Sequence, residues 1–156
     1  MPSVGDYFVV HTTGIAARLI QIGTRSKWNH AGIYIGDGKI IEARPSGVKI
    51  DNLSKYDNHK IIWSNESSLT EQERINLVNF VKGFENDGYG VWSIVALGFK
   101  CLGLSVLPAN ILAEKENKVI CSQLVAWAYS HVGVKVSKKR HALTRPKDLA
   151  DRILKK

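Results

Sequence analysis

The sequence predicts an α+β fold, because its strand-like runs come early in the chain and its helix-like runs come late. Segments rich in β-branched and aromatic residues alternate with turn residues up to Trp63, and apolar residues at helical spacing dominate after Thr70. No linker or repeat divides the 156 residues, which are enough to bury a core without disulfides or bound metals. We therefore expect one domain over residues 1–156, with a small antiparallel sheet packed against helices.

Five short segments predict strands, over residues 5–10, 30–35, 39–43, 48–50 and 60–63. The triplet Gly36-Asp37-Gly38 joins the second and third of these segments, which is typical of a tight hairpin. These two strands are therefore expected to pair antiparallel.

Five other segments predict helices, over residues 14–23, after Thr70, over 89–102, over 121–131 and from Pro146. Thr70 and Glu73 have the spacing of a capping box. The expected apolar positions of the second and last helices are Ile75, Leu77, Val78, Val81 and Phe84, and then Leu149, Ile153 and Leu154. The run 91–107, which contains Lys100, is shorter than a membrane span and predicts a buried or partly membrane-facing helix.

His30 and Glu42 are predicted to lie on the same face of the hairpin. If a three-residue loop is closed by Gly38 in a left-handed conformation, Ile33 faces Ile41 on an apolar face. His30 and Glu42 then fall on the other face, whereas a two-residue loop would put them on opposite faces. The pairing of histidine and carboxylate therefore depends on an odd number of loop residues.

Cys121 begins the predicted helix over residues 121–131. At this position the helix dipole favours the thiolate, which is the nucleophilic form, and free backbone N–H groups can stabilise an oxyanion. Taken alone, Cys121 is more typical of a buried structural cysteine than of a nucleophile, and we expect Cys101 to be a buried structural cysteine. A thiol, a base and a carboxylate are the minimal set for covalent acyl transfer. In this set Cys121 is the nucleophile, His30 the general base and Glu42 the group that orients the imidazole.

The order of these residues resembles the circularly permuted branch of the NlpC-type papain-like superfamily, which includes the YiiX-like amidases and the lecithin–retinol acyltransferase relatives. The resemblance lies in the segments GDYFVV, NHAGIYIGDGKIIEA, ICSQLVAWAY and RPKDLAD. It implies a papain-like fold with Cys121, His30 and Glu42 at the catalytic positions. Glutamate at the third position is more similar to the YiiX-like amidases, since the acyltransferase relatives tend to have a second histidine there. The resemblance therefore implies amide hydrolysis.

The sequence and this resemblance together predict a cysteine peptidase or amidase that acts on peptidoglycan stem peptides or cross-links. Tyr34, Asn29 and Ser122 are predicted to contact the substrate. Two alternatives stay open: a lipid-directed thiol acyltransferase or deacylase at a membrane surface, and a non-catalytic binding module. No cofactor or metal is expected, because the two cysteines form no CxxC or Cys/His cluster.

The net charge of +8 favours an anionic partner, although it could serve solubility alone. A basic cluster around a predicted loop is most simply a solvated face, although it could dock to an anionic polymer or a membrane surface. It consists of Lys135, Lys138, Lys139, Arg140, Arg145 and Lys147. Aromatic residues do not alternate with these basic residues, so we expect no nucleic-acid binding, and we expect a monomer. The N-terminal residues do not resemble a secretory signal, which predicts synthesis in the cytoplasm. The resemblance suits a phage- or bacterium-encoded enzyme that acts at the cell wall.

Overall fold

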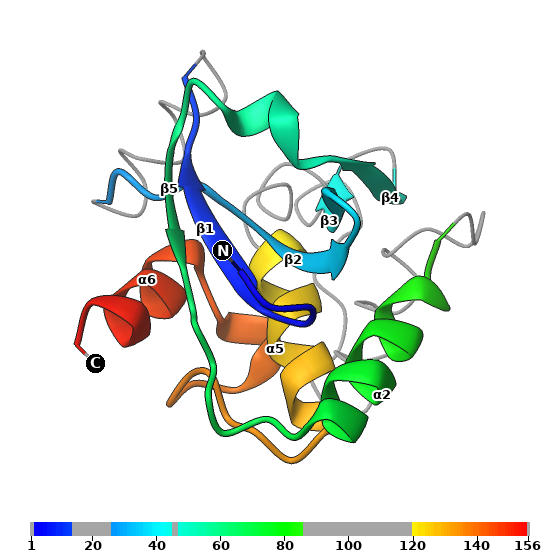
Figure 1. Cartoon of the computed structure of the whole chain (residues 1–156). Coiled ribbons are helices and arrows are strands. Elements are labelled where there is room, and N and C mark those ends of the chain that lie inside the picture. Colours follow the sequence, from blue (N-terminus) through cyan, green and yellow to red (C-terminus); the bar gives the residue numbers. More distant parts are fainter. Residues whose placement is uncertain (1, 14–25, 45–46, 86–119, 156) are drawn as a thin grey trace, which may run out of the picture.

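A five-stranded antiparallel sheet forms the centre of the computed structural model, which describes residues 2–13, 26–44, 47–85 and 120–155 (Figure 1). The strands are β1 (Tyr7–His11), β2 (His30–Gly36), β3 (Lys39–Arg44), β4 (Gly47–Asn52) and β5 (Lys60–Trp63). Their order in the sheet is β4-β3-β2-β1-β5. All five predicted strands are thus confirmed. The helices predicted over residues 14–23 and 89–102, the run 91–107 and Cys101 lie outside the described residues.

Three α-helices and two short 3-10 helices complete the described part of the chain: α2 (Glu71–Lys82), α5 (Ile120–His131), α6 (Pro146–Leu154), η1 (Leu53–Tyr56) and η2 (His141–Leu143). Helix α5 packs against β2 and β3 and lies between α2 and α6 (Figure 1). Strands early in the chain and helices late confirm the predicted α+β class.

The two faces of the sheet carry different apolar clusters. The larger cluster joins the sheet to α2, α5 and α6 and includes Tyr7, Ile33, Leu77, Leu124 and Leu149. The smaller cluster lies on the opposite face, where η1 covers the sheet, and consists of Phe8, Val10, Ile40 and Tyr56 with the partly buried residues packed against them. Because side chains alternate along a strand, successive residues of β1 contribute to different clusters.

Helix α2 begins as the sequence predicts, since the Thr70 hydroxyl accepts from the Glu73 backbone N–H and the Glu73 carboxylate accepts from that of Thr70. Its buried residues are Leu77, Val78 and Val81. The sequence also placed Ile75 and Leu154 on apolar helix faces. Both are exposed, at 45% and 63%, because each lies on the solvent side of its helix.

The loop of the β2–β3 hairpin differs from the predicted three-residue loop. The turn consists of Asp37 and Gly38, both with positive φ, and Gly36 pairs with Lys39. An irregularity between Tyr34 and Gly36 adds one residue to β2, so that Ile33 still faces Ile41 as predicted. The extra residue lies in a β-bulge and not in the loop. It preserves the face relationship that a two-residue turn alone would have reversed.

Candidate active site

His30 and Glu42 contact each other across the hairpin. The Nε2 atom of His30 lies 2.9 Å from Oε2 of Glu42, which is within hydrogen-bonding distance. Glu42 is fully buried, whereas a fifth of the His30 side chain is exposed. The imidazole therefore has its inner nitrogen fixed by a buried carboxylate, while part of the ring reaches the surface.

Glu42 is held by donors that come from β3 and η1. The Tyr56 hydroxyl donates to Oε2 at 2.8 Å, the same oxygen that faces His30. Arg44 donates from Nε to Oε1 at 2.7 Å, and the ammonium group of Lys55 donates to that oxygen as well. Each carboxylate oxygen is thus shared by two donors, which fixes the orientation of the carboxyl plane toward the histidine.

A second carboxylate completes this charge network. Asp51 on β4 forms ion pairs with both Arg44 and Lys55, so that two acidic and two basic side chains lie together. Burial alone would raise the pKa of Glu42. Hydrogen bonding and charge from His30, followed by hydrogen bonds from Lys55 and Tyr56, outweigh burial and lower that pKa well below its usual range. Glu42 therefore stays ionised although it is buried.

Cys121 lies in the first turn of α5, where the backbone N–H groups of a helix lack intrahelical acceptors. It is a free thiol and is only 5% exposed. Burial lowers the pKa of His30, but the charge of Cys121 and a hydrogen bond to its side chain, followed by Glu42, raise it to about 9. The imidazole thus interacts with the thiol and the carboxylate at once, and the structure brings together all three residues that were predicted as catalytic.

The three residues predicted to contact substrate make other interactions. The Asn29 side chain exchanges three hydrogen bonds with Thr12 and is 3% exposed. The Ser122 hydroxyl donates to the carbonyl oxygen of Thr144 at 2.6 Å, and the Tyr34 hydroxyl accepts from the backbone of Gly38. These bonds hold strand ends and loops in place. Contact of these residues with substrate stays a prediction.

Three neighbours of Glu42 were not predicted from the sequence: Arg44, Lys55 and Tyr56. Arg44 could have been found, because it lies two residues after Glu42 and side chains at that spacing share a face of the strand. Lys55 and Tyr56 had no such signal. They belong to η1, whose packing over the sheet depends on the turn after β4.

Metal ligation and membrane insertion were considered for the described residues. In the part of the chain that the structure describes, no group of three or more His, Cys, Asp or Glu side chains could hold a metal ion. No helix within residues 2–13, 26–44, 47–85 or 120–155 is long and apolar enough to cross a membrane.

Comparisons with known proteins show the fold. No protein-family model matches the chain. The crystal structure of the metalloprotein YiiX from Escherichia coli O157:H7 is similar to 89% of this chain and 71% of that one, with a TM-score of 0.58 and 19% sequence identity. This likeness confirms the predicted papain-like α+β fold; the predicted circular permutation stays a prediction.

One curated relative is similar in sequence. It is the probable lipoprotein peptidase YaeF of Escherichia coli K12, which is 28% identical over 93 residues. The match covers 58% of this chain but only 34% of the relative, so the chain spans about a third of that protein's length.

Proposed function

We propose that this protein is a cysteine peptidase or amidase in which Cys121 is the nucleophile, His30 the acid–base group and Glu42 the orienting carboxylate. The observation that carries the proposal is that the His30 ring bonds to a buried carboxylate through Nε2 and also interacts with the side chain of Cys121. The similarity to a protein described as a probable lipoprotein peptidase supports hydrolysis of an amide bond.

The first half of the proposed reaction forms an acyl-enzyme. With the pKa of His30 raised to about 9, the ring is protonated at neutral pH and can pair with a Cys121 thiolate. The thiolate attacks the amide carbonyl, and the N–H groups in the first turn of α5 stabilise the oxyanion. His30 then donates its proton to the departing amine, which leaves a thioester on Cys121.

The second half releases the acid product. His30, now neutral, accepts a proton from a water molecule that attacks the thioester. Re-formation of the carbonyl then expels the Cys121 thiolate, which restores the starting pair of thiolate and imidazolium. Glu42 keeps its charge throughout and holds the imidazole in one orientation and one tautomer. Tyr56, Lys55 and Arg44 act as positioning residues, because they contact Glu42 and not the reacting atoms.

The substrate that we propose is an amide bond in peptidoglycan stem peptides or cross-links, cleaved by a monomeric enzyme that is made in the cytoplasm and acts at the cell wall. A lipid-directed thiol acyltransferase or deacylase would use the same three residues and is the second candidate. A binding module without turnover is less well supported, because it would not need a thiol, an imidazole and an ionised carboxylate in contact.

Product analysis distinguishes these functions. Purified peptidoglycan and vesicles of acyl lipids are each incubated with the wild type and with Cys121→Ser, and the products are identified by mass spectrometry. New amino and carboxyl termini in peptidoglycan that depend on Cys121 would support the proposal, with Cys101→Ser as the matched cysteine control. Release of fatty acid alone would favour the lipid enzyme. No product from either substrate, with normal binding of peptidoglycan, would favour the binding module.

A further inference from the structure

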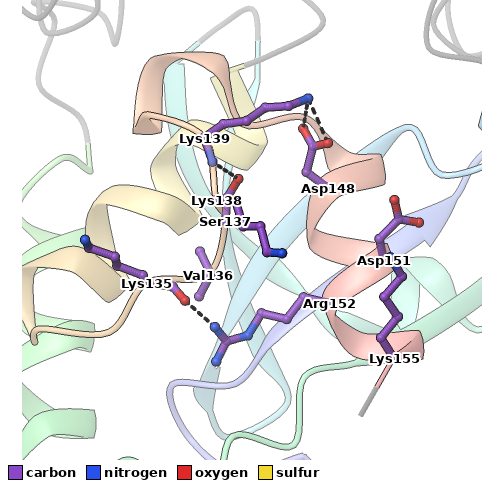
Figure 2. Close-up of a pocket in the computed structure, with 9 residues that line it drawn as sticks. All are labelled: Lys135, Val136, Ser137, Lys138, Lys139, Asp148, Asp151, Arg152 and Lys155. Atoms are coloured by element: carbon purple, nitrogen blue, oxygen red, sulfur yellow. Dashed lines mark hydrogen bonds and ion pairs between the residues drawn. The ribbon is translucent and has the colours of Figure 1, made fainter.

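A pocket of about 610 Å³ lies between α6 and the segment 135–139 that follows α5 (Figure 2). Val136, which is 3% exposed, contributes an apolar side chain to its lining. This volume lies within the range of pockets that bind small molecules. The pocket is formed by residues outside the candidate active site.

The pocket is held open by contacts between its two walls. The Arg152 guanidinium on α6 donates to the backbone carbonyl of Lys135 on the opposite wall (Figure 2). The same guanidinium forms an ion pair with Glu66, which is buried, at 2.5 Å. Because these bonds join α6 to the segment 135–139 and to the loop before α2, the pocket does not need a ligand to form.

The acidic side chains of the pocket are already neutralised. One carboxylate oxygen of Asp148 accepts from Lys139 at 3.0 Å, and the other accepts from Arg145 at 3.2 Å. Asp151 pairs with Lys147 at 2.7 Å. Three members of the basic cluster predicted from the sequence are therefore engaged within the protein, which leaves other cations of the pocket to attract a ligand.

The remaining cations of the pocket are Lys135, Lys138 and Lys155, which line it and are exposed. None of the three forms an ion pair with another residue that the structure describes. Each lysine keeps a hydrated ammonium group on a flexible chain, and all three line the same concave surface. The pocket is therefore an electropositive site whose charge the protein does not compensate.

We propose that this pocket binds phosphate groups of a flexible anionic polymer. Lysine binds phosphate as a compact point charge. The guanidinium groups of Arg145 and Arg152 already donate to Asp148 and to Glu66 and the Lys135 carbonyl, so the lysines are the cations that remain for a ligand. A concave site admits a segment of a narrow chain more readily than a planar bilayer. The binding needs neither Cys121 nor His30, so the binding proposal can be refuted without refuting the proposed hydrolysis.

The test compares two variants with the same net charge. Lys135→Gln/Lys138→Gln/Lys155→Gln removes the lysines of the pocket, and Lys39→Gln/Lys60→Gln/Lys82→Gln removes three exposed lysines elsewhere. Calorimetric titration with linear polyphosphate should give about tenfold weaker binding for the first variant and no significant change for the second, and the salt dependence of binding should fall only in the first.

Several outcomes would overturn the proposal. Equal loss of affinity in both variants would mean that polyphosphate responds to net charge and not to the pocket. Equal or tighter binding of poly-glutamate would contradict the preference for phosphate. Tighter binding of phosphatidylglycerol vesicles than of polyphosphate would assign the lysines to a membrane surface. Since all the substituted lysines are exposed, an unchanged melting temperature is expected for both variants and shows that the comparison is between folded proteins.

Discussion

Replacing Glu42 with glutamine tests whether its carboxylate controls the charge state of His30. The change keeps an oxygen for His30 Nε2 but removes a negative charge 2.9 Å from that nitrogen. A neighbouring opposite charge shifts a pKa by about one to three units, and Lys55 and Arg44 already share the charge of Glu42, so the lower end applies. The pKa of His30 should therefore fall from about 9 by about one unit, which corresponds to about 1.4 kcal/mol.

NMR titration of the His30 ring measures this shift without a substrate. The titration is repeated in a Cys121→Ala background, because the side chain of Cys121 also raises the pKa of His30. Glu71→Gln is the matched control, since it removes the same charge from an exposed position at the start of α2. If the pKa of His30 does not move in Glu42→Gln, or moves equally in the control, the carboxylate does not act on the ring and the reasoning is refuted.

Three further predictions concern the same site. Iodoacetamide should modify Cys121 below pH 8 and much faster than Cys101, and equal slow labelling, measured by mass spectrometry, would mean that neither thiol is activated. Tyr56→Phe should lower the free energy of unfolding in urea by about 1.5–3 kcal/mol, because its hydroxyl donates to the charged Glu42. The Tyr7 hydroxyl donates to a neutral carbonyl, so Tyr7→Phe should lower the free energy of unfolding by only about 1 kcal/mol. Equal losses of stability in the two variants would contradict this account. Because the pKa of Glu42 is lowered on folding, its contribution to stability is present above its unfolded pKa and is lost as the pH falls below about 4. Acid titration of unfolding should show this loss in the wild type, and an identical curve for Glu42→Gln would rule it out.

The sequence could predict which hairpin residues share a face, because one face of the pair is buried and apolar. The pairing of Ile33 with Ile41 follows from that constraint alone. The turn could not be predicted in the same way. Asp37-Gly38 is a favoured two-residue turn and Gly36-Asp37-Gly38 a plausible three-residue loop, and the choice depends on whether the strand before it contains a bulge.

The candidate catalytic residues were also accessible from the sequence, since each belongs to a short local pattern. The residues that donate to Glu42 from η1 could not be predicted, because they reach it only through tertiary contacts. Lys55 and Tyr56 reach the carboxylate only when η1 folds over the sheet, and no periodicity within residues 53–56 indicates that packing. Buried ionised groups of this kind are recognised only when their partners are known.

The burial of Glu42 has a consequence for how the protein should respond to ionic strength. The carboxylate of Glu42 is fully buried while its partners His30, Arg44 and Lys55 are only partly exposed, so added salt screens these interactions less than it screens pairs of surface charges. The lysines of the pocket between α6 and residues 135–139 are exposed, and their attraction to a polyanion is screened over about 10 Å at 0.1 M salt. Raising the salt concentration should thus detach the protein from an anionic scaffold while its thiol keeps its reactivity, so that attachment and chemistry can be varied separately in one sample.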